Sequence, residues 1–363
     1  MGSGLSPDKR TVGRQFPPRM TRKTLRAFFY AQLLTVAACS NQGLEPVRRE
    51  STVMGTFVSV TIFDEHVRRE FAQAMIDSVF EEMKRIESIA TDYADSSDIG
   101  QVNAHAGIET VSVSKEIARL VEESILYSET SLGAFDITVG PLVHSWDFLS
   151  DSPRVLSRAE LNGLLPLVNY RNIVWENDKV FLKKKGMRLD LGAIAKGYAV
   201  DRAIALLKRR GLTNVIVDLG GNLGVSWDGT RLLDSTRATI FIRHPRRDGE
   251  MFGHFEVGTS GVSTSGDYQR YFTSGGVRYH HILDPHTGEP ARDVVSVTIV
   301  AGDATKADAL STTVFVLGRE KGMSLIEDLK DVEGMIIHEQ GDTLGYMLSS
   351  GLKGRFVWGE PRD

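Results

Sequence analysis

The chain has little cysteine, and this scarcity excludes several kinds of architecture. Among its 363 residues the single cysteine is Cys39, so neither a disulfide framework nor a metal site of several thiolates is possible. The apolar run 27–38 is too short to span a bilayer as a helix. Tandem repeats and low-complexity runs are also not evident in the sequence.

An excess of charge of one sign is likewise missing. The sequence holds 47 acidic and 43 basic residues, for a formal net charge of −4. No basic stripe with interleaved aromatic residues occurs after the N-terminal region, which argues against a nucleic-acid partner. With 41% hydrophobic residues the composition is that of a globular protein with a large core.

The N-terminal residues 1–45 differ in character from the rest of the chain. Basic residues precede the apolar run 27–38, a pattern typical of an export signal. Cys39 follows directly and resembles the lipidated cysteine of a bacterial lipobox, which predicts a protein anchored by lipid on the periplasmic side of the cell envelope. Val36 stands where a lipobox usually has leucine, so ordinary signal-peptidase cleavage stays open. We therefore leave 1–45 out of the fold and assign 46–363 to one domain.

Hydrophobic periodicity after residue 45 predicts both strands and helices. Alternation over 52–63, with Met54 near its start, predicts a strand. Apolar residues three to four apart predict amphipathic helices over 67–90 and 115–128. The polar loop between these helices contains Tyr93, which is either a partly packed surface residue or a contact to a ligand.

The segment 190–201 (DLGAIAKGYAVD) predicts a glycine turn that leads from a strand over 180–189 into a helix. Backbone N–H groups and the dipole at a helix start suit a phosphate, and Lys196 adds a full charge. The alternative is that Lys196 and Asp201 form a structural ion pair in the core. A nearby loop, GAFD at 133–136, places one acid, Asp136, among apolar residues, where it either caps a turn or binds a ligand.

A block rich in small residues, STSGD at 263–267, is followed after a glycine turn by HILDP at 281–285. Glycines and hydroxyls allow a backbone to approach a ligand closely. His281 could act as a base at neutral pH, although a lone histidine in a strand more often serves packing.

The segment ADALST at 307–312 places Asp308 and Thr312 four residues apart. On a helix they project from the same face, so a carboxylate and a hydroxyl can meet one hard cation such as Mg²⁺. Two oxygens alone make a weak site. The alternative is that both side chains bond their own backbone.

Taken in order, these segments resemble the FAD:protein FMN transferases, the ApbE/Ftp family of flavin-trafficking lipoproteins. The matching segments are MGT at 54–56, Tyr93 with Asp98, GAFD at 133–136, 190–201, VDLGGN at 217–222, STSGD at 263–267, HILDP at 281–285 with TG at 287–288, and ADALST at 307–312. Each is weak alone, and together they are specific.

The resemblance implies an α+β fold, a single catalytic unit with mixed, mainly antiparallel sheets and packed helices. It implies His281 as the base and a Mg²⁺ held by the carbonyl of Ala193 and the side chains of Asp308 and Thr312. The implied FAD-lining residues are Met54, Tyr93, Ala134, Phe135, Asp136, Asp190, Lys196 and Ile282.

The implied reaction is Mg²⁺-dependent transfer of FMN from FAD to a serine or threonine hydroxyl of another exported protein, with release of AMP. The family's acceptor motif, an Asp ahead of Ser/Thr-Gly-Ala-Thr/Ser, does not occur in this chain. Two alternatives remain open: FAD hydrolysis to FMN and AMP, and a flavin-binding lipoprotein without turnover. A base and a metal pair argue against pure binding.

Overall fold

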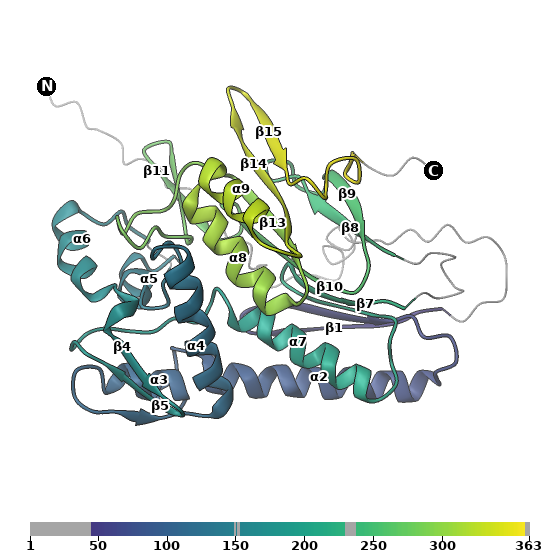
Figure 1. The fold of residues 1–363 in the computed structure, drawn as a ribbon, viewed down its shortest axis with the longest axis horizontal. Coiled ribbons are helices and arrows are strands. Elements are labelled where there is room, and N and C mark those ends of the chain that lie inside the picture. Colours follow the sequence, from purple (N-terminus) through teal and green to yellow (C-terminus); the bar gives the residue numbers. More distant parts are fainter. Residues whose placement is uncertain (1–44, 149, 151–152, 229–236, 360–363) are drawn as a thin grey trace, which may run out of the picture.

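An eight-stranded sheet is the centre of the fold in the computed structural model, which describes residues 45–148, 150, 153–228 and 237–359 (Figure 1). Every neighbouring pair in it is antiparallel. In spatial order its strands are β1 (Val47–Val53), β2 (Thr56–Ile62), β6 (Val215–Leu219), β7 (Asn222–Ser226), β10 (Ser260–Gly266), β13 (Ser296–Ala301), β14 (Glu333–Gln340) and β15 (Thr343–Leu348).

One face of this sheet is covered by a row of helices that contact one another in turn (Figure 1). From the β1 edge to the β15 edge, the helices follow one another in the order of the strands that they contact. The helices are α2 (Arg69–Ala90), α7 (Ala195–Arg209), α8 (Ala304–Leu317) and α9 (Arg319–Asp328). Helix α8 is buried on most of its circumference, because α7 and α9 flank it while β10 and β13 lie beneath it.

Smaller elements complete the described fold. The opposite face of the sheet carries a second hydrophobic core, which includes residues of β8 (Ala238–Arg243) and β9 (Met251–Val257), with β16 (Val357–Trp358) at the edge of β9. The remaining elements are α3 (Asp98–Ala104), β3 (Val111–Ser112), α4 (Lys115–Thr130), α5 (Gly140–Trp146), α6 (Arg158–Leu164), the 3₁₀ turns η1 (Leu165–Leu167) and η2 (Tyr170–Asn172), β4 (Ile173–Glu176), β5 (Lys179–Leu182), β11 (Tyr271–Ser274) and β12 (Val277–His280).

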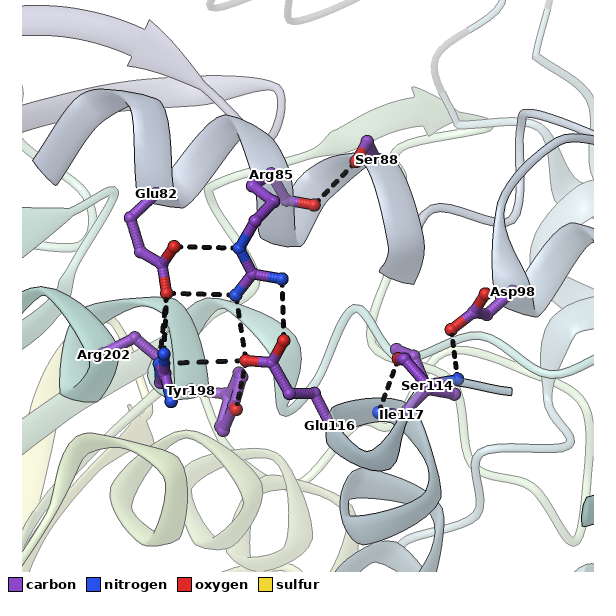
Figure 2. Close-up of polar contacts among 9 residues, drawn as sticks. All are labelled: Glu82, Arg85, Ser88, Asp98, Ser114, Glu116, Ile117, Tyr198 and Arg202. Carbon is purple, nitrogen blue, oxygen red and sulfur yellow. Dashed lines mark hydrogen bonds and ion pairs between the residues drawn. The ribbon is translucent and has the colours of Figure 1, made fainter. Parts of the chain in front are cut away.

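A charged network joins α7 to α2 and α4, as Figure 2 shows. Arg85 donates to Glu82 at 2.8 Å and to Glu116 at 2.7 Å. From α7, Arg202 donates to Glu82 at 3.0 Å and the Tyr198 hydroxyl donates to Glu116 at 2.7 Å. Hydrogen bonds from Arg85 are the main cause that lowers the pKa of both glutamates. Their contribution to stability is therefore present at neutral pH and is lost as the pH falls through the lowered pKa values.

The predicted α+β fold with mainly antiparallel sheets is confirmed, and the single parallel contact between described residues is an isolated bridge from Val139 to Arg188. The predicted strand 52–63 is wrong at its start. Met54 and Gly55, with φ of 52° and 67°, form the tight turn between β1 and β2. The predicted strand 180–189 ends at Leu182, because a turn with Gly186 at φ 88° interrupts it.

Candidate active site

The N-terminal turns of α7 and α8 lie against each other at Gly197. A Cβ placed on this residue would stand 2.2 Å from the carbonyl oxygen of Ala304 and 2.8 Å from the Cβ of Asp308, so only glycine allows this approach. Asp308, which is 3% exposed, accepts the backbone N–H of Gly197 at 2.9 Å. In return Asp201 of α7 accepts the backbone N–H of Thr305 at 2.8 Å, at the start of α8. Asp201 therefore caps α8 and does not pair with Lys196.

Lys196 lies between the turn before α7 and the carboxylate of α8. Its Nζ donates to the carbonyl oxygen of Gly192 and is 3.9 Å from Oδ2 of Asp308. Asp190 Oδ1 accepts the backbone N–H of Gly192 at 2.7 Å, which closes the same turn. Burial raises the pKa of Asp190, and the nearby carboxylate of Asp92 raises it further. The turn therefore gathers carboxylates and one lysine at the start of a helix.

Asp308 and Thr312 project from α8 toward the sheet and the start of α7. The hydroxyl of Thr312 is 3.4 Å from that of Ser265 on β10, and Ser311 is 2.8 Å from the same Ser265 hydroxyl. Asp308 accepts a backbone bond through Oδ2 only, and no described residue donates to its Oδ1. The alternative in which both side chains bond their own helix does not describe this arrangement.

These residues fit a hard divalent cation by the chemistry of their atoms. Mg²⁺ prefers oxygen ligands, and Asp308, Thr312 and the carbonyl of Ala193 supply a carboxylate, a hydroxyl and an amide oxygen. A buried carboxylate with one unused oxygen also favours a cation. Across the described ranges there is no group of three or more His, Cys, Asp or Glu side chains placed to hold a metal. The site would accordingly depend on this one carboxylate, neutral oxygens and the substrate.

His281 comes directly after β12, outside the strand. Its backbone N–H and its Nδ1 both face the carbonyl oxygen of Arg270, at 3.1 and 3.3 Å. A carbonyl can only accept, so Nδ1 carries the proton and the neutral ring presents the lone pair of Nε2. No described residue is hydrogen-bonded to Nε2. Burial first, and then the positive charge of Arg270, lower the pKa of His281 to about 3, so the ring is unprotonated at neutral pH.

The neighbouring His280 has a structural role. It is 3% exposed, and its Nε2 donates to the carbonyl oxygen of Ala291 at 2.7 Å while its Nδ1 accepts the N–H of Ile282 at 3.3 Å. Both ring nitrogens are thus used within the chain. Of the two adjacent histidines, only His281 has a nitrogen available to a substrate.

The predicted flavin-lining residues differ in their exposure to solvent. Tyr93 is 69% exposed, and its ring lies 5.2 Å from that of His144. Asp136 is 8% exposed and accepts from Thr138 at 2.8 Å and from the N–H of Tyr170 at 2.9 Å. Asp136 thus stabilises its own loop by hydrogen bonds, which agrees with the alternative that this acid caps a turn. Ala134, Phe135 and Ile282 are buried, at 4%, 2% and 6% exposure.

The loop of Asp136 is nevertheless tied to the segment of Asp190. The backbone N–H of Asp190 donates to the carbonyl oxygen of Ile137 at 2.8 Å, which joins the two predicted flavin segments side by side. Met54 lies in the β1–β2 turn, and the guanidinium of Arg270 is near this turn at Gly55. The roles of the individual residues in binding stay predictions.

An aspartate–histidine pair lies next to Tyr93 and could not be predicted from the sequence. Asp92 is 8% exposed, and its Oδ2 is 2.5 Å from Nε2 of His144. Arg188 donates to the backbone carbonyl of Asp92 at 3.0 Å. These residues come from distant parts of the chain, and no spacing rule connects them. The contacts of Ser263 and Ser265 with Ser311 of α8 could have been expected from the sequence. Both serines lie on β10, and residues two apart on a strand share a face.

The chain is similar to known proteins over most of its length. The ApbE family profile matches residues 54–336. The FAD:protein FMN transferase of Treponema pallidum is 34% identical over 320 residues, covering 84% of this chain and 88% of that protein. The corresponding protein of Vibrio cholerae is 32% identical, covering 82% and 89%.

Solved structures give the same result. The ApbE protein of Thermotoga maritima superposes with a TM-score of 0.77 at 33% identity, over 86% of this chain and 99% of that one. The flavin transferase ApbE of Vibrio cholerae gives a TM-score of 0.75 at 29% identity, over 86% and 99%. The matched residues include the turns of α7 and α8 and His281, so this chain belongs to the ApbE family.

Proposed function

We propose that this protein transfers FMN from FAD to a serine or threonine hydroxyl of an acceptor protein, in a Mg²⁺-dependent reaction that releases AMP. The names of its relatives support FAD as the substrate and a protein as the acceptor. The observation that carries the proposal is His281, whose Nε2 is free of hydrogen-bond partners in the described structure while Nδ1 is fixed by Arg270.

The chain's own groups account for the proton transfer. Nε2 of His281 takes the proton from the acceptor hydroxyl as its oxygen attacks the phosphorus on the FMN side. The bond from that phosphorus to the bridging oxygen breaks, and AMP leaves with the bridging oxygen. Because the FMN phosphoester on the acceptor is itself the product, no covalent enzyme intermediate is needed.

The α7 and α8 turns would receive the diphosphate. Lys196, at the start of α7, would orient it through the charge of its side chain. Asp308, Thr312 and the carbonyl of Ala193 would hold Mg²⁺, which when bound offsets negative charge on the diphosphate. Pure flavin binding would require neither a base with a free nitrogen nor such an oxygen cluster.

A reaction with an acceptor domain tests the proposal. The protein is incubated with FAD, Mg²⁺ and a domain that carries the family's acceptor motif, and intact mass is measured over time. We expect the acceptor to gain the mass of one FMN, with AMP release that depends on the acceptor. Release of AMP at the same rate without acceptor would instead indicate hydrolysis of FAD. Bound FAD without any AMP would leave only a binding protein.

The proposal includes export and a lipid anchor on Cys39, so that the acceptor is another exported protein. Residues 1–44 lie outside the described residues, and this part rests on sequence alone. None of the helices in the described part combines the length and apolar character needed to cross a bilayer. In a bacterial host we expect the Cys39→Ala variant to leave the membrane fraction. A variant that stays there at the wild-type level would contradict the anchor.

A further inference from the structure

Arg270 lies directly beside the proposed base. It occupies the short connection between β10 and β11, and its carbonyl oxygen accepts both the backbone N–H and the Nδ1–H of His281, at 3.1 and 3.3 Å. Any displacement of Arg270 would therefore move the imidazole as well. The backbone of this residue positions the base, which leaves the purpose of its side chain open.

The guanidinium of Arg270 reaches toward the other predicted flavin residues. A Cβ placed on Gly55 would stand 3.7 Å from its Nη2, so the group lies against the turn that carries Met54. Its positive charge helps to lower the pKa of His281. The side chain thus lies against the turn that carries Met54, while the backbone carbonyl of the same residue holds His281.

This guanidinium has no hydrogen-bond or ion-pair partner among the described residues, although the side chain is partly buried. The nearby carboxylate of Asp267 is already used. Arg246 binds it through two contacts at 2.6 and 2.7 Å, and Arg278 binds it at 3.1 Å. Lys196, the other cation of the site, has Asp308 and the carbonyl of Gly192 as neighbours. Arg270 is therefore a cation beside the proposed base to which the described residues offer no anion.

We propose that Arg270 binds the FMN-side phosphate of FAD, the phosphate that is transferred. This inference rests on the proposed function in taking FAD as the substrate. A general base must lie about 2.6–3.2 Å from the hydroxyl that it deprotonates, and that oxygen attacks the phosphorus. The phosphoryl oxygens consequently lie close to His281 and within reach of the residue bound to it. The planar fork of arginine suits two such oxygens, and its charge opposes the negative charge of the transferred group.

Ligands that differ by one phosphate test this assignment. Dissociation constants for riboflavin, FMN and AMP are measured for the wild-type protein and for Arg270→Gln, Arg270→Lys and Arg292→Gln. Arg292 is an exposed arginine soon after His281, so its variant matches the loss of charge. We expect Arg270→Gln to weaken FMN binding by about 10- to 100-fold, as for a charge-assisted hydrogen bond. Affinity for riboflavin and AMP should stay within about twofold of wild type by the same reasoning.

The two remaining variants separate the effect of the guanidinium shape from the effect of charge. Arg270→Lys keeps the charge without the fork and should lose less affinity for FMN, whereas Arg292→Gln should lose none. Equal weakening of riboflavin and FMN in Arg270→Gln would overturn the assignment in favour of a packing role. Unchanged FMN affinity in Arg270→Gln would also overturn the assignment. Because the comparison needs no acceptor, absence of transfer by the wild-type protein would contradict the proposed function and not this assignment.

Discussion

Oδ2 of Asp308 accepts the backbone N–H of Gly197 at 2.9 Å, which places a carboxylate of α8 on the first turn of α7. Asp201 makes the reverse contact, since its carboxylate accepts the backbone N–H groups of Ala304 and Thr305, each at 2.8 Å. Each helix therefore satisfies N–H groups that the other leaves unpaired at its start. The relative position of Lys196 and Thr312 depends on this reciprocal contact.

A methyl group at Gly197 should separate the two helices. Because the added Cβ would stand 2.2 Å from the carbonyl oxygen of Ala304, we expect Gly197→Ala to lower the free energy of unfolding by about 1–3 kcal/mol, as for an overpacked core. Urea unfolding measures this change. Transfer of FMN should fall as well, since the variant displaces Asp308.

Gly163→Ala is the matched control. Gly163 also lies inside a helix, α6, but a Cβ there would meet nothing within 4 Å. The better helix propensity of alanine should leave this variant as stable as the wild type or stabilise it by up to about 1 kcal/mol. If both variants had the same stability, the close approach of α7 and α8 would not be the reason for glycine at 197.

Asp308→Asn should impair metal binding with little change of shape. The amide oxygen can still accept the N–H of Gly197, but the charge on the oxygen offered to a cation is lost. Loss of a direct ligand should exceed the about 10- to 100-fold that outer-shell partners contribute to metal affinity. Calorimetric titration with Mg²⁺, in the presence of FAD, measures the effect.

Asp303→Asn provides the comparison for the metal experiment. Asp303 is an exposed cap of the same helix, and asparagine caps equally well. Mg²⁺ affinity should therefore remain unchanged in this variant. An equal loss in both variants would show that the charge of α8 as a whole, and not Asp308, determines the affinity.

The low pKa of His281 predicts a dependence of stability on pH. Its value falls from 6.5 in the ordinary side chain to about 3 in the fold, so folding favours the neutral ring. As the pH falls below about 6.5, the unfolded chain binds a proton that the folded protein does not, and stability decreases by at most about 1.4 kcal/mol per pH unit. The stability of wild type relative to His281→Gln should therefore decline between pH 7 and 5 in urea unfolding. A difference that stays constant over this range would contradict the low pKa.

Much of the fold could be predicted from sequence because its signals are local. The period of apolar residues predicts helices over 67–90 and 115–128, and α2 and α4 occupy Arg69–Ala90 and Lys115–Thr130. A serine just before a helix commonly caps it, and Ser97 accepts the N–H of Gly100 at the start of α3. The turn at Met54 was missed, because residues on both sides of it favour strands.

The site could be predicted only in part. The sequence predicts His281 and Asp308 as site residues, and their roles stay predictions. It does not predict the residues that they contact. Arg270 is eleven residues from His281 in sequence, and Asp92 meets His144 across 52 residues. Such contacts arise from tertiary packing, which no local spacing encodes. The two hydrogen bonds that Asp201 accepts from the start of α8 could likewise not be predicted from the sequence. The alternative of an ion pair between Asp201 and Lys196 is wrong, because Lys196 lies beside Asp308.

The most direct test of the account is the rate of FMN transfer by His281→Gln. The variant, bound to FAD and Mg²⁺, is mixed with the acceptor domain, and flavinylated acceptor is followed by intact mass. His286→Gln, which alters an exposed histidine nearby, serves as the control. Loss of a general base predicts that His281→Gln is slower by about 10²- to 10⁴-fold while FAD affinity and the control stay near wild type. Transfer by His281→Gln at the wild-type rate would contradict the account.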